Sequence, residues 1–338
     1  MRVLDWRWWL GIRPRFTKDP VPAYDITVVI PAYNEEHSIA DTIESVKAQT
    51  VPITHIIVVD DCSRDATGDI ARAHGAKVIR ASVNQGTKAL AQNYVLPDVT
   101  TELVVTIDAD TILAPDAIEN TLPFFGDPRT ASVCGFVIPQ RIKSVWERAR
   151  FIEYLFSISL CKAGQNNFGA ILVSSGCFSV FRTDVLKKLG GFKARTMAED
   201  MDFTWEAQRE GYHIYCAQDA LCFPLDPSTA RIYIAQLDRW YRSFFQNVRI
   251  HRWKVNRKLA CIIYGELASA IVSQGFFLLF LSLAMRTSSP GYYLTWGMLI
   301  DLIVVALPCV IKGARMGMLG KPILSIPFYF VVRPVNQF

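Results

Sequence analysis

The sequence predicts an α/β domain with a mostly parallel central sheet, followed by a membrane-embedded region. Two observations predict the domain. Short apolar runs alternate with segments of helical periodicity between residues 26 and 110, and each run lacks a polar face, as do strands buried on both sides. One observation predicts the membrane region: the apolar fraction of this 338-residue chain rises sharply after Leu259.

Strands and helices are predicted to alternate along the first third of the chain. Asn34 is expected to begin the first helix and Gly75 to end the second. Because the carboxyl ends of parallel strands meet at one edge of a sheet, polar residues there converge where such folds bind a nucleotide. The strands are ITVVIPAY from Ile26, HIIVVDD from His55, AKVIRA from Ala76 and ELVVTIDAD from Glu102, with helices over 34–50, 63–75 and 87–96.

Further helices are predicted in the next part of the chain. The stretch WERARFIEYLFSISL within residues 141–168 is amphipathic, and residues 232–250 form a longer helix rich in Trp, Tyr, Phe and Arg. Shorter helices are expected over 183–189 and 202–211, while 171–181 fits either a strand or a loop.

Two long apolar segments predict a transmembrane hairpin. Residues 259–285 and 292–311 are each long enough to span a hydrocarbon core. Basic stretches, HRWKVNRK and KGARMGMLGK, flank the pair, whereas the loop between them carries a single charge. The positive-inside rule therefore places both outer ends, and the α/β domain, in the cytoplasm. A shorter apolar segment, 322–332, is compatible with an interfacial, a re-entrant or a third spanning placement.

Two features near the membrane have two interpretations each. Glu266 and Asp301, inside the predicted spans, either line a translocation path or contact a lipid headgroup, or they hydrogen-bond between packed helices. Residues 1–20, rich in Trp and Arg, lack the uninterrupted apolar core of a signal peptide. They form either a short interfacial anchor or a terminus packed on the domain.

Composition argues against several classes of partner and site. The net charge of +5 is concentrated beside Trp-rich or apolar segments, which favours membrane lipids over nucleic acid as a partner. The eight cysteines include no CxxC pair and the five histidines show no ligand spacing, so a zinc site is not expected. Scattered cysteines of this kind suit a reducing, cytoplasmic setting.

Asp108 and Asp110 follow the fourth predicted strand and form a candidate metal site. Residues two apart in a strand face the same side, and a turn lets both carboxylates reach one cation. Mg²⁺ and Mn²⁺ prefer such oxygen ligands, and Mg²⁺ commonly bridges to phosphates. The alternative is a solvated turn, since Asp-x-Asp triplets also occur by chance.

Two further positions suit nucleotide binding. Asp60 or Asp61 ends the second strand, where a carboxylate could accept the N3–H of a pyrimidine base. Alternatively, Asp61 or Ser63 caps the next helix. Lys88 could lie near phosphates as a point charge.

Two later motifs suit group transfer to a hydroxyl. In AED, Glu199 or Asp200 could remove the proton of an acceptor hydroxyl, although the motif alone is typical of a helix cap. In QLDRW, Gln236, Arg239 and Trp240 are spaced to share one face of a helix. Arg239 could pair with diphosphate oxygens and Trp240 could face a sugar ring. The alternative for this stretch is an interfacial aromatic belt.

Taken in this order, the motifs make the chain resemble the family 2 glycosyltransferases of the GT-A fold. The resemblance is to the membrane-integrated branch of cellulose, chitin, hyaluronan and poly-N-acetylglucosamine synthases, the last of these most of all. It covers residues 26–240, with the C-terminal hairpin in the expected place. The matching stretches are PAYNEE, VVDDCSRD, NQGTKALAQN, TIDADTILAPDA, VSSGCFSVFR, MAEDMD and QLDRW.

The resemblance implies a role for each matching residue. Tyr33 is expected to stack near uracil, and Asp110 to coordinate the cation directly. The full set assigns Pro31, Tyr33 and Glu35 to the first nucleotide-binding segment, Asp60 and Asp61 to uridine, Lys88 to the donor side, Asp108 and Asp110 to Mg²⁺ or Mn²⁺, Gly176 and Cys177 to the acceptor end, Asp200 beside Glu199 to general-base catalysis, and Gln236, Arg239 and Trp240 to the diphosphate and acceptor.

The resemblance also implies an activity. We expect an inverting, metal-dependent transferase that moves a sugar, N-acetylglucosamine, from a UDP-sugar to a growing glycan at the cytoplasmic face of the plasma or inner membrane. The alternative is a single addition to a polyprenyl phosphate or another lipid acceptor, because the membrane part is small for a processive synthase unless the chain forms a homo-oligomer. A receptor without turnover is disfavoured, since every expected carboxylate is present.

The same resemblance suggests a division of the chain into four parts. They are an interfacial segment over 1–20, the GT-A catalytic domain over 21–230, an interfacial helix with the QxxRW motif over 231–258, and a multi-pass transmembrane region over 259–338.

Overall fold

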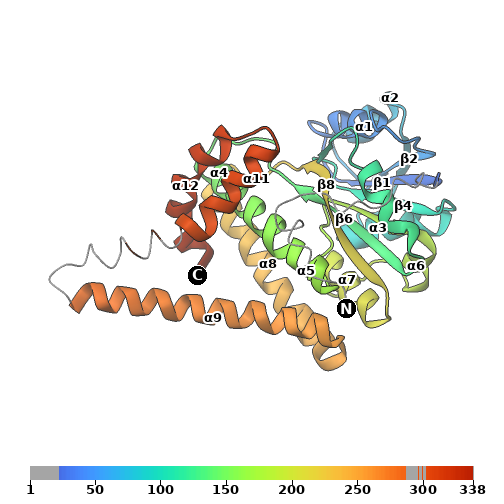
Figure 1. The fold of residues 1–338 in the computed structure, drawn as a ribbon. Helices are drawn as coiled ribbons and strands as arrows, with labels where there is room; N and C mark the ends of the chain where they lie inside the picture. The colour runs from blue at the N-terminus through green and yellow to red at the C-terminus, as the bar shows by residue number, and fades with distance from the viewer. Residues whose placement is uncertain (1–22, 287–295, 297–298, 300–301, 338) are drawn as a thin grey trace.

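The protein folds around an eight-stranded mixed sheet with helices on its faces (Figure 1). The computed structural model describes residues 23–286, 296, 299 and 302–337. The strands lie in the order β3-β2-β1-β4-β7-β6-β8-β5 across the sheet. Their bounds are β1 Ile26–Ala32, β2 His55–Asp60, β3 Lys77–Arg80, β4 Leu103–Ile107, β5 Ile112–Leu113, β6 Thr130–Val137, β7 Phe178–Arg182 and β8 His213–Phe223.

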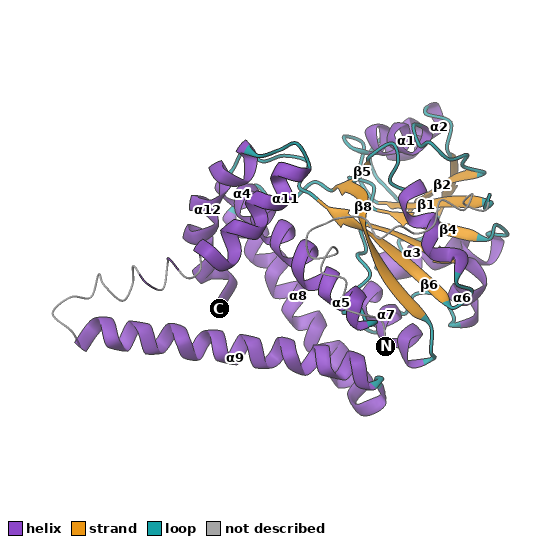
Figure 2. Cartoon of the chain, in the orientation of Figure 1, coloured by secondary structure: helices purple, strands orange, loops and turns teal. Residues whose placement is uncertain are grey.

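Helices connect the strands and continue beyond the sheet toward the C-terminus (Figure 2). Most are α-helical, but η3 and η5 are π-helical segments and η1, η2 and η4 are 3₁₀ turns. The helices are α1 Ile39–Lys47, α2 Thr67–Ala73, α3 Lys88–Val95, η1 Leu96–Asp98, η2 Glu119–Gly126, α4 Val145–Phe156, η3 Ser157–Lys162, α5 Ala163–Phe168, α6 Thr183–Lys188, α7 Glu199–Arg209, α8 Ala230–His251, η4 Arg252–Lys254, α9 Arg257–Arg286, η5 Leu302–Ala306, α11 Leu307–Arg315 and α12 Gly320–Gln337.

Parallel pairing is confirmed for the four strands that the sequence indicated. β1 pairs with β2 and with β4, and β2 pairs with β3, all in parallel. The rest of the sheet is mixed: β7 runs antiparallel to both β4 and β6, β5 runs antiparallel to β8, and β6 and β8 are parallel. The parallel half therefore has the expected doubly covered geometry, and an antiparallel pairing joins it to the other half.

The strands are continuous apolar runs because both faces of the sheet are covered. Val28 and Ile30 of β1 are fully buried, as is Val105 of β4. β6 is buried along its whole length although it contains polar residues. The hydroxyls of Ser132 and Ser174 hydrogen-bond each other at 2.9 Å, which satisfies them inside the core.

The carboxyl ends of β2 and β4 flank the end of β1 at one edge of the sheet. Ala32 pairs with Asp60 across β1 and β2, and the N–H of Asp61 donates to the carbonyl of Ala32 at 2.9 Å. Asp108 follows directly after β4, and its N–H donates to the carbonyl of Cys177 at 3.1 Å. The acidic strand ends therefore meet as the sequence predicted.

The expected helix start at Asn34 is wrong. α1 begins only at Ile39, and Asn34 has a left-handed backbone with φ of 57°, a conformation that asparagine tolerates better than most residues. Its side-chain oxygen accepts the N–H of Arg64 at 2.8 Å, and its own N–H donates to the hydroxyl of Ser63 at 3.1 Å. Asn34 thus ties the loop after β1 to the loop after β2.

The last two helices pack on α4 (Figure 1). Cys309 of α11 is buried, and its Sγ donates to the carbonyl of Ile152 at 3.6 Å. Val332 of α12 is buried beside Ala149 and Tyr233. The end of the second predicted span and the third apolar segment therefore lie against the α/β domain in this structure.

α9 is the candidate membrane span among the described helices, over Arg257–Phe276, by length and composition alone. Figure 1 shows it extending past the rest of the fold, and Ile271 and Phe276 on it are exposed. Residues 1–20 lie outside the described residues, as do 292–295, 297–298 and 300–301 of the second predicted span, which include Asp301. The transmembrane hairpin and the N-terminal interfacial segment therefore stay predictions.

Candidate active site

Tyr33 and Glu35 leave the sheet at the end of β1, just after Pro31. The side chain of Tyr33 is 46% exposed, so its ring is open to a planar ligand. The N–H of Glu35 donates to the hydroxyl of Thr67 at 2.7 Å, and the Glu35 carboxylate accepts the hydroxyl of Ser38 at 2.7 Å. These bonds fix the loop beneath the exposed tyrosine.

Asp60 and Asp61 end β2 in different surroundings. Asp60 is fully buried in an ion pair of 2.6 Å with Arg80, so it anchors the loop. Asp61 accepts the N–H of Gln85 at 2.7 Å and is the better placed of the two to meet a ligand. α2 has no side-chain cap, so the alternative that Asp61 or Ser63 caps it is wrong.

Five of the predicted residues converge beside the end of β4. Lys88, at the start of α3, forms an ion pair with Asp108 and lies 3.9 Å from Glu199. Its Nζ also donates to the carbonyl of Gly176 at 2.7 Å. The N–H of Gly176 donates at 2.8 Å to Oδ2 of Asp200, which lies in the first turn of α7. Gly176 thus contacts the lysine through its carbonyl and Asp200 through its amide.

No side chain fits at Gly176 without displacing its neighbours. A Cβ placed there would lie 3.0 Å from Asp200 Oδ2 and 3.3 Å from Lys88 Nζ. The next residue, Cys177, is half-buried and accepts the N–H of Asp108. The ends of the Asp200 and Lys88 side chains thus approach the backbone closely at this glycine, and a side chain here would push them by a few tenths of an ångström.

Asp110 lies in a crowded group of carboxylates. Burial, together with the negative charges of Asp108 and Glu35, raises the pKa of Asp110 to about 6. Among the described residues, no third carboxylate, cysteine or histidine completes a metal-binding group with Asp108 and Asp110. Two carboxylates supplemented by phosphate oxygens are a common ligand set for Mg²⁺. The pair therefore fits a divalent cation that binds together with a phosphate-bearing ligand.

Two lysines flank the carboxylates of α7. Burial raises the pKa of both Glu199 and Asp200, and the ammonium of Lys88 opposes the rise. Burial alone would lower the pKa of Lys88, but the neighbouring carboxylates raise it, so Lys88 stays charged. Lys162, from the π-helical segment η3, donates to the hydroxyl of Ser175 at 2.7 Å and also lowers the pKa of Asp200.

Gln236 and Trp240 of α8 contact one buried arginine. Arg150 of α4 is 2% exposed, and its Nη2 donates to Oε1 of Gln236 at 2.9 Å. Its guanidinium carbon lies 4.6 Å from the centre of the Trp240 ring. Arg239 is exposed and has no ion pair with another described residue. The three motif residues therefore divide into two anchored side chains and one exposed cation.

Arg150 and Asp226 also belong to this site, although neither lies in one of the motifs that the sequence analysis identified. Asp226 follows β8, is 7% exposed and accepts the hydroxyl of Tyr154 at 3.0 Å. Burial, with a contribution from Asp110, raises its pKa to about 7, so the two carboxylates are electrostatic neighbours. The signal that could have found Arg150 is its place next to Phe151 on the buried face of an amphipathic helix.

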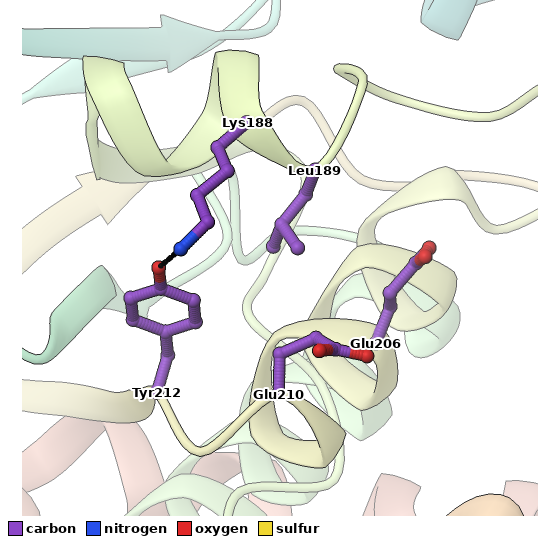
Figure 3. Close-up of a pocket in the computed structure, with 5 residues that line it drawn as sticks. All are labelled: Lys188, Leu189, Glu206, Glu210 and Tyr212. Carbon is purple, nitrogen blue, oxygen red and sulfur yellow. Dashed lines mark hydrogen bonds between the residues drawn. The ribbon is translucent and has the colours of Figure 1, made fainter.

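A separate hollow of about 260 Å³ lies between α6 and the C-terminal part of α7 (Figure 3). Its polar lining includes Lys188, whose Nζ donates to the hydroxyl of Tyr212 at 3.0 Å. No predicted site residue lines it, and the carboxylates of the candidate site lie at the opposite end of α7. The remaining lining residues are Leu189, Glu206 and Glu210.

Sequence comparison matches part of the chain, including every strand except β8, to a known family. Residues 27–190 match the model of glycosyl transferase family 2. The poly-β-1,6-N-acetyl-D-glucosamine synthase of Staphylococcus epidermidis is 31% identical over 223 residues, which cover 64% of this chain and 53% of the relative. The synthase of the same name from Staphylococcus aureus strain COL is 28% identical over 263 residues, 73% of this chain and 62% of the relative. The chain thus spans only part of the length of these relatives.

Solved structures share the fold. A mannosyltransferase from Pyrobaculum calidifontis, PcManGT, solved with GDP-Man and Mn²⁺, covers 98% of this chain and 93% of its own, with a TM-score of 0.67 and 22% identity. Residues 1–349 of S. aureus TarS give a TM-score of 0.51 and 17% identity, covering 93% of this chain and 90% of that one. These likenesses support the expected GT-A fold. The chain therefore carries a glycosyl transferase family 2 domain, and over that domain it resembles the poly-β-1,6-N-acetyl-D-glucosamine synthases.

Proposed function

We propose that this chain transfers N-acetylglucosamine from a UDP-sugar to a growing glycan, with inversion at the anomeric carbon and a divalent cation bound. The observation that carries the proposal is the contact of Gly176 with both Lys88 and Asp200, beside Asp108. A candidate cation site and a buried base then lie on two sides of one short loop. A displacement at a sugar phosphate needs its leaving group and its nucleophile held in this kind of proximity.

The donor nucleotide would bind over the ends of β1 and β2. The exposed ring of Tyr33 would stack on the base, and the carboxylate of Asp61 would accept its N3–H. Lys88 would lie beside the phosphates as a fixed positive charge. Asp60, already paired with Arg80, would keep the loop in place rather than contact the ligand.

Asp108 and Asp110 would hold the cation, with Asp110 coordinating it directly. When bound, the cation would supply charge neutralisation for the departing diphosphate. Arg239, exposed and without an ion pair among the described residues, would add a second positive charge to the diphosphate. Trp240, 37% exposed, would present the uncovered part of its ring to the acceptor sugar.

Asp200 would act as the general base. Its carboxylate takes the proton of the acceptor hydroxyl while that oxygen bonds to the anomeric carbon, and the bond from this carbon to the diphosphate breaks to release UDP. A single displacement of this kind inverts the anomeric centre. The raised pKa of Asp200 makes its carboxylate a better proton acceptor than an exposed aspartate. Glu199, beside it, would help keep Lys88 in place.

The named relatives support the choice of sugar and of a polymeric product, since both are poly-β-1,6-N-acetyl-D-glucosamine synthases. The cytoplasmic membrane face is supported by α9, whose exposed apolar surface follows the basic stretch over 251–258. Membrane lipids are therefore expected partners, and a homo-oligomer is part of the proposal.

The test is UDP release by the purified full chain in nanodiscs, with Mn²⁺ or Mg²⁺, across a panel of UDP-sugars, followed by sizing of the product. Release with UDP-N-acetylglucosamine and a ladder of products is the expected result. A single lipid-soluble product would instead favour addition to a polyprenyl phosphate. No release with any donor, despite metal-dependent UDP binding, would contradict the proposed activity.

A further inference from the structure

We infer that Arg150 is a positioning residue that orients Gln236 and Trp240 toward the donor diphosphate and the acceptor. The inference rests on the proposed function for the roles of those two residues, but its geometric part does not. Arg150 lies on α4, in a different element from both, and 86 residues from Gln236 in sequence. It would touch neither substrate.

The first observation is that one guanidinium contacts three residues of α8. Tyr233, Gln236 and Trp240 are spaced i, i+3 and i+7, so they share one face of the helix. The guanidinium carbon of Arg150 lies 4.2 Å from the Tyr233 ring centre and 4.6 Å from the Trp240 ring centre, and Nη2 donates to Gln236 between them. A planar guanidinium can stack on rings and donate in its plane at once, which an ammonium cannot.

The second observation is that Arg150 is itself held from the other side. Its Nη1 donates to Glu153 Oε2 at 2.6 Å, and its Nε lies 3.9 Å from Asp226 Oδ1. Glu153 also accepts the hydroxyl of Tyr233 at 2.7 Å, so the same carboxylate binds both the arginine and the helix that the arginine contacts. The guanidinium is therefore fixed in its plane before any ligand arrives.

The third observation is that two buried polar atoms in this group have no hydrogen bond within the described chain. They are Nε of Arg150 and Oδ2 of Asp226. Unsatisfied buried polar groups destabilise a fold and call for an explanation. Both atoms lie between α4 and the end of β8, beside the Arg150 contacts with α8.

The orientation of the Gln236 amide follows from these contacts. Because Arg150 donates to Oε1, the amide NH₂ points away from the arginine and is left to donate to an anionic oxygen. Without Arg150 the amide is free to turn its oxygen toward the diphosphate, where it would repel the ligand. Arg150 thus determines that Gln236 acts as a donor, and it keeps the ring of Trp240 in place.

The test compares Arg150→Lys with Arg148→Lys, a matched change two residues away on the same helix. Arg148 contacts Phe328 of α12 instead of α8. Hydrogen–deuterium exchange of residues 230–251 should rise in Arg150→Lys and stay at the wild-type level in Arg148→Lys. With turnover, Arg150→Lys should raise the KM of the donor, through the turned Gln236 amide, and the KM of the acceptor, through the displaced Trp240 ring, by roughly tenfold each, as expected for a lost charge-assisted hydrogen bond, while kcat changes by less than about twofold.

A second variant tests the amide itself. Gln236→Glu keeps an oxygen for Arg150 but removes the NH₂ donors, so exchange of α8 should stay low while UDP binds roughly tenfold more weakly. Wild-type exchange in Arg150→Lys, or equal effects in the two lysine variants, would overturn the inference. If the wild type turns over no donor, the proposed function fails, whereas the exchange measurement still decides whether Arg150 positions α8.

Discussion

At the scale of single residues, the chemistry of the site comes from placement rather than from residue type. Asp200 and Asp202 lie two residues apart on α7, yet burial raises the pKa of Asp200, whereas hydrogen-bond partners outweigh burial and lower that of Asp202. The first is therefore suited to accept a proton, and the second to remain a fixed negative charge.

Asp200→Asn should abolish turnover and leave UDP binding largely intact. The asparagine oxygen can still accept the N–H of Gly176, so the loop should hold its shape, but the amide cannot take a proton from a hydroxyl. Turnover and UDP affinity, measured on the same preparation, check this. Near-normal rates in Asp200→Asn would show that another group is the base.

Asp110→Asn should abolish turnover and weaken metal-dependent binding of the donor, because one of two cation ligands loses its charge. Calorimetric titration with UDP, with and without Mn²⁺, measures the difference. Asp116→Asn is the matched control, since Asp116 is an exposed aspartate in the same stretch of chain. An unchanged metal requirement in Asp110→Asn would remove Asp110 from the cation site.

At the scale of elements, α8 is fixed to the domain at both ends. Arg150 contacts its first half, and a buried contact between His251 and Asp202 holds its C-terminal end. His251 Nε2 lies 2.6 Å from Asp202 Oδ1, and Arg195 donates to both oxygens of the same carboxylate at 2.8 and 2.9 Å. Because Asp202 lies in the first turn of α7, the QxxRW helix and the helix of the base are joined.

Asp202→Asn should destabilise the protein by about 3 kcal/mol at pH 7, the scale for breaking a buried pair. Burial would raise the pKa of Asp202, but contacts with His251 and Arg195 hold it below its ordinary value. A lowered pKa stabilises the fold above the unfolded-state pKa of about 4 and loses that effect as the pH falls through the folded-state value. The difference between wild type and variant should therefore shrink in acid.

Unfolding in detergent at pH 7 and at pH 3 measures both parts of this prediction. Asp238→Asn is the control, since Asp238 pairs with Arg242 on the exposed face of the same α8 and should cost less than about 0.5 kcal/mol. A pH-independent effect in Asp202→Asn would mean that packing, not charge, holds the end of α8.

At the scale of the whole molecule, the exposed apolar surface of α9 is the feature that a membrane would cover. Val272→Asp should weaken binding to anionic vesicles by roughly a hundredfold, because a charge at the centre of a membrane helix costs about 3 kcal/mol. Vesicle flotation measures this. Tyr94→Asp places the same charge on α3, at an exposed position, and should bind the vesicles as strongly as the wild type does. Equal flotation of both variants would show that α9 does not enter the bilayer.

The sequence predicted the parallel half of the fold better than the mixed half. The strands of the parallel half are uniform apolar runs. In the mixed half, β8 contains Gln218 and Asp219 among buried cysteines, and β6 contains polar side chains whose hydrogen bonds are made by partners elsewhere in the chain. Those partners come from distant parts of the chain and leave no local periodicity. The same reason applies to the candidate site: the motif residues could be named from the sequence, whereas the contacts of Arg150 and Asp226 form only when α4, α8 and the end of β8 are brought together.

The contacts of Gly176 have a consequence for changing the specificity of this protein. Under the proposed function, its carbonyl sets the position of the donor-side lysine and its amide sets the position of the base, so any shift of this loop moves both together. Variants that enlarge the sugar pocket through the loop would also misalign the acceptor. Altered selectivity should therefore be sought at side chains that leave this backbone untouched, such as Tyr33 for the nucleotide base and Trp240 for the acceptor sugar, where donor and acceptor can be changed one at a time.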